Sequence, residues 1–492
     1  MNKNTYKNSL LFLGLMTTAT LYASDKPNIV LIYGDDVGYG DISCNGAKLV
    51  KTPNIDRIAK NGIRFTDGHC SASTCTPSRY AMLTGRAAFR NKARILPGDA
   101  PLLIDTNIIT LPKVLRKAGY KTGVVGKWHL GLGNGNLNWN EEIKPGPREI
   151  GFDYSFLIPA TGDRVPCVYV ENQRVVNLDQ NDPITVSYKK KVGDWPTGRE
   201  NPELLKMTLS KGHDMTIVNG ISRIGYMTGG TKALWVDEDM ADEITNKAVS
   251  FIDKNKKQPF FLYFSFHDIH VPRVPHPRFV GSTKMGPRGD AIAQMDWCVG
   301  QVYKKLAAEG LLENTIIIYS SDNGPVLDDG YNDDAVEKLG KHKPAGQFRG
   351  GKYGLYEGGN RMPFIISWPK KIAKGEVSNA LVSQLDFLAS FAALTGVEIE
   401  KEQLNKLDSK NILTAFLGED KVGRRYLLEE GYGIALRDGM WKLITKKRKN
   451  YTVLYNLGDD IGEKNNLAEK YPEKVKELKR KLAEIKANPR AQ

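Results

Sequence analysis

The stretch Asn28-Ile29-Val30-Leu31-Ile32-Tyr33-Gly34-Asp35-Asp36 is a run of apolar residues that ends in a glycine and two carboxylates. An apolar run without alternation of polar side chains is typical of a strand buried on both faces of a sheet. The same pattern returns in Thr315-Ile316-Ile317-Ile318-Tyr319, which leads to Asp322 and Asn323. Both segments are therefore predicted to be central strands with polar residues at their carboxyl ends.

Two further apolar runs, at residues 122–125 and 260–264, also precede polar side chains. Helical patterns lie between the predicted strands, at residues 54–60, 110–118, 240–254 and 290–308. Alternation of helices with continuously apolar strands predicts an α/β protein, in which a large, mostly parallel sheet is sandwiched by helices. The region 139–232 is rich in glycine, proline and charge, and we expect loops there with only small strands, such as one at 168–170.

The last part of the chain has a different pattern. Short β-like segments at 425–428, 434–436, 441–445 and 453–455 precede a charged helical segment at 472–486. This order predicts a small C-terminal antiparallel sheet with one helix. We place the main domain at residues 25–420 and this C-terminal α+β subdomain at 421–492.

The N-terminus has the pattern of a secretory signal peptide. Lys3 and Lys7 precede an apolar stretch at 10–16, and small or polar residues lead to Ala23 and Ser24. We predict a signal peptide over residues 1–24 and an exported protein, periplasmic or extracellular. No later apolar run is long enough for a transmembrane helix, so no membrane span is expected.

The chain carries 70 Lys and Arg against 56 Asp and Glu, for a net charge of +14. Nucleic-acid binding would call for basic residues interleaved with aromatics on one face, or for a known module, and the sequence has neither. We therefore expect no nucleic-acid partner. A basic surface is compatible with a polyanionic substrate, although solvated charge is the simpler interpretation of the basic runs at 189–191 and 446–449.

The polar residues after the predicted strands form candidate sites. Ligand sites of open α/β sheets lie at the carboxyl ends of the strands. Asp35, Asp36, Asp322 and Asn323 offer only oxygen ligands, which suit calcium or magnesium. Neighbouring carboxylates repel each other unless a cation lies between them.

The segment Cys75-Thr76-Pro77-Ser78-Arg79-Tyr80-Ala81-Met82-Leu83-Thr84-Gly85-Arg86 predicts a helix. Pro77 suits the first helical position, Thr76 can cap it and Gly85 can end it. Cys75 would then lie at a helix N-terminus, which favours an anion and lowers a thiol pKa.

This segment resembles the signature of the formylglycine-dependent sulfatases, type I and arylsulfatase-like, and the order of motifs resembles that family along most of the chain. The resemblance implies an alkaline-phosphatase-like fold and oxidation of Cys75 to formylglycine, whose hydrate attacks sulfur. It implies a partner that performs this oxidation, a formylglycine-generating or anaerobic sulfatase-maturating enzyme. It also implies one calcium ion, bound by residue 75 and by Asp35, Asp36, Asp322 and Asn323.

The resemblance assigns further catalytic roles. Lys127 and His129, in Gly126-Lys127-Trp128-His129-Leu130-Gly131, would contact the modified residue and draw a proton from its hydroxyl. His270, followed by x-Pro, would contact sulfate and protonate the leaving alcohol. Lys352 would clamp a sulfate oxygen. It lies in a glycine-rich stretch, but this stretch does not end in the Gly-Lys-Ser/Thr of a phosphate-binding P-loop. Arg79 would partner the formylglycine and the metal site.

Substrate contacts are less specified by the sequence. Asp163, Arg164 and His213 are candidates by polarity and location. His267 is a further candidate for direct contact with substrate, or else a supporting or merely structural histidine. The segment 163–172 resembles bacterial carbohydrate sulfatases, some of which act on 6-sulfated galactose or N-acetylgalactosamine. The prediction is an exported sulfatase that hydrolyses carbohydrate O-sulfate.

Two alternatives stay open. One is a phosphonate or phosphodiester hydrolase of the same superfamily, and the other is a non-catalytic protein that binds sulfated glycans with Cys75 unmodified. The pairing of the other cysteines cannot be derived from the sequence; these are Cys44, Cys70, Cys167 and Cys298.

Overall fold

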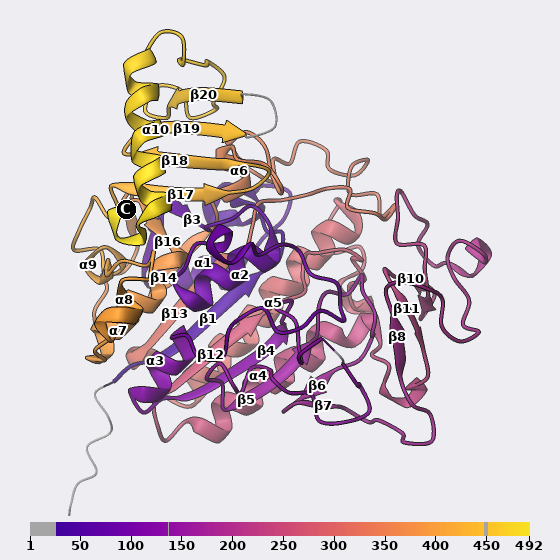
Figure 1. The fold of residues 1–492 in the computed structure, drawn as a ribbon. Helices are drawn as coiled ribbons and strands as arrows, with labels where there is room; N and C mark the ends of the chain where they lie inside the picture. The colour runs from indigo at the N-terminus through magenta and orange to yellow at the C-terminus, as the bar shows by residue number, and fades with distance from the viewer. Residues whose placement is uncertain (1–25, 136, 447–450) are drawn as a thin grey trace, which may run out of the picture.

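The computed structural model describes residues 26–135, 137–446 and 451–492, so the predicted signal peptide lies outside the described residues. A large sheet runs through this part of the chain (Figure 1), and its strand order is β15-β2-β14-β13-β1-β12-β4-β5-β6-β7. The four strands predicted from apolar runs lie next to one another at its centre and are parallel. They are β13 (Thr315–Ser321), β1 (Asn28–Gly34), β12 (Phe260–Ser265) and β4 (Lys121–Lys127).

The outer strands make the sheet mixed. β5 (Tyr154–Ile158) extends the parallel part beside β4, although only small strands were expected in that region. β14 pairs antiparallel with β13 on the other side. The remaining outer strands are β6 (Val170–Glu171), β7 (Arg174–Val175), β14 (Phe364–Ser367), β2 (Ile63–Phe65) and β15 (Glu376–Ser378).

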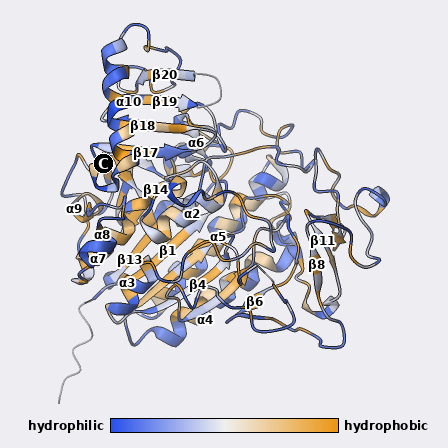
Figure 2. Cartoon of the chain, in the orientation of Figure 1, coloured by the Kyte–Doolittle hydropathy of each residue, from blue (hydrophilic) through white to orange (hydrophobic). Residues whose placement is uncertain are grey.

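Helices cover both faces of the sheet, as predicted. Alternate residues of β1 point to opposite sides: Leu31 joins one apolar core and Ile32 the other. Figure 2 shows the central strands as the most hydrophobic part of the cartoon. The first core is shared with α2 (Cys75–Thr84), α3 (Leu111–Lys117) and α7 (Phe387–Thr395), and the second with α1 (Pro53–Lys60), α4 (Met240–Asn255) and α5 (Gly286–Ala308).

The C-terminal part forms an antiparallel sheet with one long helix, in agreement with the prediction (Figure 1). Leu478, Leu482 and Ile485 of the helix pack on the apolar face of the sheet, so this side of the charged helix is a packing surface. The domain boundary at residue 421 stays a prediction. The elements are β17 (Tyr426–Glu430), β18 (Ile434–Asp438), β19 (Trp441–Lys446), β20 (Tyr451–Asn456) and α10 (Pro472–Ala487).

Shorter elements complete the described chain. The strands β8 and β11 pair with each other, as do β9 and β10, and β3 pairs with β16. Their bounds, with those of the short helices, are β3 (Gly68–His69), β8 (Thr185–Ser187), β9 (Ile217–Val218), β10 (Ile221–Ser222), β11 (Tyr226–Thr228), β16 (Val382–Ser383), α6 (Glu357–Asn360), α8 (Lys401–Leu404) and α9 (Leu413–Phe416).

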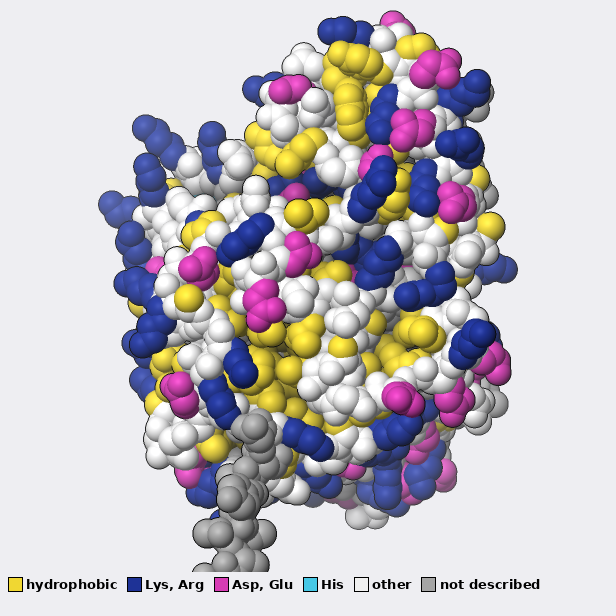
Figure 3. Space-filling view, turned by 90° about the vertical axis from the view of Figure 1, so that its left-hand side faces the viewer, with side chains coloured by type: hydrophobic (Ala, Val, Ile, Leu, Met, Phe, Trp, Pro, Cys, Tyr) yellow, Lys and Arg dark blue, Asp and Glu magenta, His cyan; other side chains and the backbone are white. Residues whose placement is uncertain are grey.

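The surface and the cysteines add two observations. On the face shown in Figure 3, Lys and Arg side chains are spread among acidic ones rather than gathered in one patch. All five cysteines lie in the described part and none is in a disulfide. Among the described helices, none combines the length and the apolar character needed to cross a membrane.

Candidate active site

The predicted strand-end residues converge at one edge of the central sheet. Asp35 and Asp36 follow β1, Asp322 and Asn323 follow β13, and Lys127 ends β4. Because these strands are parallel and adjacent, their carboxyl ends deliver all of these side chains to the same place. Each of them is fully buried.

Ligand atoms of Asp35, Asp36 and Asp322 lie within 4.8 Å of one another. Burial raises the pKa of the Asp35 and Asp36 carboxyls, and the charge of Asp322 raises both further. Neither Asp35 Oδ1 nor Asn323 Oδ1 finds a hydrogen-bond partner within the described ranges. Buried oxygens without partners beside repelling carboxylates are the features of a site for a hard cation.

Cys75 is the first residue of α2, so the predicted position at a helix N-terminus is confirmed. The capping prediction is wrong: Thr74 is the N-cap, and the Thr76 hydroxyl donates to the backbone oxygen of His129 at 2.9 Å. Gly85 ends the helix in the left-handed region, with φ of 64°, as expected.

The expected lowering of the Cys75 pKa is also wrong. Burial of the thiol raises its pKa, and this effect exceeds the opposing influence of the Lys127 and Lys352 charges. The thiol is 1 % exposed, so desolvation of the thiolate dominates the helix-end effect. The charges of Asp35 and Asp322 also act on the thiol, which places Cys75 beside the acidic cluster.

Arg79 lies one turn into α2 and binds the cluster directly. Its Nε and Nη2 donate to Asp322 Oδ2 at 3.0 and 2.8 Å. The third nitrogen of Arg79, Nη1, donates to the hydroxyls of Tyr263 and Ser265 on β12. This buried, fully bonded guanidinium holds α2 against the strand ends, and the Asp322 pKa is lowered by its charge.

Lys127 and His129 both face the site from the end of β4. The Lys127 ammonium pairs with Asp35 Oδ2. His129 Nε2 lies 2.9 Å from the carbonyl oxygen of Leu96, which can only accept, so Nε2 carries the proton. Nδ1 is buried with no hydrogen-bond partner among the described residues, and burial together with the Lys127 charge lowers the His129 pKa. His129 is therefore a neutral imidazole with a free lone pair.

His270 and Lys352 border the same cluster. His270 Nδ1 donates to the backbone oxygen of Val271 at 2.7 Å, and Nε2 lies 3.9 Å from Asp36 Oδ2. Lys352 Nζ donates to Asp36 Oδ2 and Asp329 Oδ2, both at 2.9 Å. Burial, followed by the Lys352 charge, lowers the His270 pKa. An anion bound between these two side chains would favour the charged imidazolium.

Glycines allow the Lys352 loop to lie against the end of β13. The Gly324 N–H donates to the Gly359 oxygen at 3.0 Å. A Cβ on Gly324 would lie 2.0 Å from the Gly358 oxygen, a distance that backbone cannot tolerate. This contact explains why the Asp-Asn-Gly and Tyr-Glu-Gly-Gly motifs need their glycines.

The predicted substrate residues form a linked group. Arg164 Nη1 donates to both Asp163 oxygens, at 2.7 and 2.9 Å, and His213 Nε2 lies 3.0 Å from Asp163 Oδ2. The Asp163 pKa is lowered, against burial, mainly by the Arg164 charge, and the charge of His270 contributes. The group therefore borders the side of the site that contains His270.

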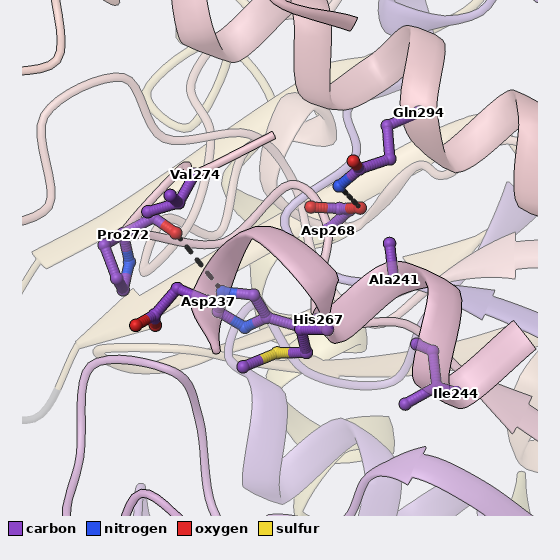
Figure 4. Close-up of a pocket in the computed structure, with 9 residues that line it drawn as sticks. Asp237, Ala241, Ile244, His267, Asp268, Pro272, Val274 and Gln294 are labelled. Carbon is purple, nitrogen blue, oxygen red and sulfur yellow. Dashed lines mark hydrogen bonds between the residues drawn. The ribbon is translucent and has the colours of Figure 1, made fainter. Parts of the chain in front are cut away.

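His267 lies next to the strand-end residues, because one of its ring nitrogens is within 4.8 Å of ligand atoms of Asp35 and His270; Figure 4 shows it beside Pro272. Its Nε2 is 3.4 Å from the Pro272 oxygen, and its Nδ1 accepts from the Gly162 N–H at 3.4 Å. The close-up also shows Gln294, which donates to Asp268 at 3.0 Å. Both His267 nitrogens contact backbone, so the supporting interpretation fits better than direct contact with substrate.

Comparisons with known proteins agree with this arrangement. The family model described as Sulfatase matches residues 27–397, and the model for the N-sulphoglucosamine sulphohydrolase C-terminal region matches residues 351–488. The chain belongs to the sulfatase family. Curated relatives include N-acetylgalactosamine-6-O-sulfatase of Bacteroides thetaiotaomicron, 51% identical over 94% of each chain, and human arylsulfatase A, 33% identical over 87% of this chain and 76% of the relative.

A solved structure gives the same result for the fold of this sulfatase. It comes from work on glycosaminoglycan metabolism by Bacteroides thetaiotaomicron, and its description names a 6S-sulfatase. It is 50% identical to this chain and has a TM-score of 0.91. The match covers 94% of this chain and all of the chain in that structure. The protein is thus a sulfuric ester hydrolase of the arylsulfatase-like family.

The sequence missed several residues that shape the site of this sulfatase. Asp329 bonds Lys352, but it lies in Asp328-Asp329-Gly330, which reads as an ordinary turn. Tyr263 and Ser265 bind Arg79 from within an apolar strand. Their position near the carboxyl end of that strand is the feature of the sequence that could have indicated a place in the site.

Proposed function

We propose that this sulfatase removes O-sulfate from carbohydrates, with 6-sulfated N-acetylgalactosamine or galactose as the preferred unit. One observation carries the proposal: Cys75, at the start of α2, lies among the charges of Lys127 and Lys352 and beside an acidic cluster with unpartnered oxygens. The choice of sugar is supported by the relative that is 51% identical over nearly the whole chain.

The proposal includes two groups that this chain would have to acquire. Asp35, Asp36, Asp322 and Asn323 would hold calcium together with residue 75, because the three carboxylates are buried close together and the Oδ1 atoms of Asp35 and Asn323 have no hydrogen-bond partner among the described residues. Cys75 would be oxidised to formylglycine by a maturating enzyme. Once present, the hydrated aldehyde supplies a nucleophilic oxygen for sulfur, and the metal offsets the negative charge of the sulfate.

Residues of the chain would bind the substrate and move protons. Lys352 and Lys127 are the buried cations that would hold sulfate oxygens. The free Nδ1 of His129 would accept a proton at residue 75. The Nδ1 of His270 is held by a hydrogen bond to a backbone oxygen, and its Nε2 would protonate the departing alcohol. Asp163, Arg164 and His213 would contact the sugar at the rim.

The experiment is release of sulfate from defined sulfated saccharides, in parallel with matched phosphate and phosphonate esters. Wild-type protein produced with a maturating enzyme is expected to desulfate the 6-sulfated sugar, and Cys75→Ala is expected to be inactive. Mass spectrometry across residue 75 checks its conversion. Preference for the phosphorus esters would instead support the superfamily alternative, and converted protein that binds but never cleaves would support a glycan-binding role.

We also propose that the protein is exported to the periplasm or the extracellular space. The support is the charged, apolar and small-residue pattern of residues 1–24. Fractionation of expressing cells, compared with a variant that lacks these residues, is the test. Equal distribution of the two proteins would contradict it.

A further inference from the structure

A pocket of about 510 Å³ adjoins the start of α2, outside the group of residues assigned above. Its walls come from three places in the chain: Thr74 and Pro77 beside Cys75, the segment that contains Arg94, and the turn at Gly431 and Tyr432. The turn joins β17 to β18 in the C-terminal sheet. This sheet therefore contributes directly to the surroundings of the reaction centre.

The wall of the pocket is joined by hydrogen bonds to the loop that carries Lys352. The Ser73 N–H donates to the Glu430 oxygen at 2.7 Å, and the Tyr353 N–H donates to the Ser73 oxygen at 2.8 Å. The Tyr353 hydroxyl donates to Asp329 at 3.1 Å, and the same carboxylate accepts from Lys352. A molecule held by this wall would thus be placed next to the residue that faces sulfate.

Two aromatic rings form an exposed platform in this wall. The Tyr353 and Tyr432 rings stack with centroids 5.7 Å apart and planes inclined by 13°. Tyr432 is 75% exposed, so the face of its ring that does not stack on Tyr353 is open to a ligand. The platform also borders a second pocket of about 260 Å³ that contains Tyr356 and Lys446, so the groove continues away from Cys75.

Charge in the pocket is positive. Arg94 is exposed, and its guanidinium makes no hydrogen bond or ion pair with any described residue. Glu430 is the acidic side chain in this lining, and burial raises its pKa to about 8, which favours its neutral form. Its Oε1 is buried and lacks a hydrogen-bond partner among the described residues. Arg94 is therefore available for an anionic group of a ligand.

We propose that Tyr353, Tyr432 and Arg94 form a subsite for the sugar unit next to the sulfated one, and that this neighbouring unit carries a carboxylate. The apolar face of its ring would lie on Tyr432, and its carboxylate would bind Arg94. This inference rests on the proposed function, since it assumes that the substrate is a sulfated saccharide. The occupant is an acidic saccharide such as one with a hexuronate unit.

The test compares three substrates: the 6-sulfated monosaccharide, and disaccharides in which that sugar is joined to a hexuronate or to a neutral hexose. Tyr432→Ala is expected to lower kcat/KM about tenfold for both disaccharides and to leave the monosaccharide unchanged. Tyr432→Phe keeps the ring face and should behave like wild type. Arg94→Ala is expected to lower kcat/KM about tenfold for the hexuronate disaccharide alone.

Arg174→Ala is the matched control, because Arg174 lies on β7 at the outer edge of the large sheet and its side chain is exposed. It should change none of the three rates. Equal rates for the three substrates with wild type, or equal losses on monosaccharide and disaccharides in the variants, would overturn the subsite while leaving the proposed function intact. Absence of sulfate release from every saccharide with converted wild type would overturn both.

Discussion

Two clusters of buried charges lie in this sulfatase, and they differ in that only the first contains two carboxyl groups, Asp35 and Asp36, whose pKa is raised beside a third, Asp322, whose pKa is lowered. The strand-end cluster consists of Asp35, Asp36 and Asp322. The junction cluster lies between the large sheet and the C-terminal sheet; it consists of Asp67, His69, Glu357, Arg361, Glu429, Arg437 and Lys442. Each cluster contains a group of side chains close enough together to ligate a metal.

The difference lies in the direction in which the surroundings shift the pKa of the carboxyl groups. In the junction cluster, Lys442 pairs with Glu357 at 2.7 Å and with Glu429 at 3.0 Å, and neighbouring cations lower the pKa of Asp67, Glu357 and Glu429 against the effect of burial. In the strand-end cluster, the pKa of Asp35 and Asp36 is raised. Proximity of carboxylates alone is therefore a poor sign of a metal site, and carboxyls whose pKa stays raised although each has a cationic partner are the better one.

Asp36→Asn should have the largest effect on activity. It removes a carboxylate that faces both the proposed cation and Lys352, and we expect kcat to fall about 1,000-fold. In metal-free buffer the variant should be at least as stable as wild type, because a buried like charge has been removed. The measurements are sulfate release and thermal unfolding with chelator. A strong loss of stability together with activity would mean that the strand-end cluster is structural, like the junction cluster.

Glu357→Gln should show the reverse pattern. It leaves Lys442 and Arg361 without a main partner, and breaking a buried ion network of this kind costs about 3 kcal/mol or more of unfolding free energy. Denaturant unfolding measures the loss. Glu473→Gln is the control, because Glu473 is exposed on α10 and should change stability little. If Glu357→Gln unfolds at the same denaturant midpoint as wild type, the junction cluster makes no net contribution to the unfolding free energy.

The two clusters also differ in how far the sequence predicts them. Each residue of the strand-end cluster follows a continuous apolar run, so the fold class and the meeting of Asp35 with Asp322 could both be predicted. The junction cluster joins residues with no shared local pattern: Glu357 and Lys442 are 85 residues apart. Glu357 also lies in the Tyr-Glu-Gly-Gly motif, where it was interpreted only as part of the Lys352 loop.

Other predictions that the structure corrects failed for the same physical reason. The Cys75 pKa depends on burial, which a helix-end pattern does not report. β5 is a short strand within a region of high polarity, and its place in the sheet comes from pairing with β4. Local patterns therefore predicted the elements and the residues they present, whereas desolvation and distant pairing had to be observed.

Calcium should stabilise the protein through the strand-end cluster alone. At a free concentration of 100 times the Kd, a bound ion adds about 2.7 kcal/mol to the unfolding free energy. We expect a rise in Tm for wild type, none for Asp36→Asn, and a normal rise above its own lower baseline for Glu357→Gln. The measurement is thermal unfolding across a calcium titration. An undiminished rise in Asp36→Asn would place the ion elsewhere.

His69 should give the junction cluster its own pH dependence. Its two ring nitrogens lie 2.7 Å from Asp67 and from Glu429, and these hydrogen bonds raise its pKa above 6.5 despite burial. The stabilisation from the charged ring is therefore complete below about pH 6.5 and is lost as the pH rises through the higher folded-state value. Protonation of the carboxylates, whose pKa values are lowered, removes their contribution only in acid, below about pH 4.

The contribution of the charged ring should thus be greatest between about pH 4.5 and 6.5. His69→Gln, which removes the charge but can still donate a hydrogen bond, should be less stable than wild type by about 1.5 kcal/mol at pH 5.5. The difference should shrink toward pH 9, where His69 of the wild type loses its proton. Unfolding midpoints of both proteins from pH 4 to 9 measure it. A difference that does not change with pH would mean that the ring stabilises the junction by packing, and that the charge balance proposed for this cluster does not include His69.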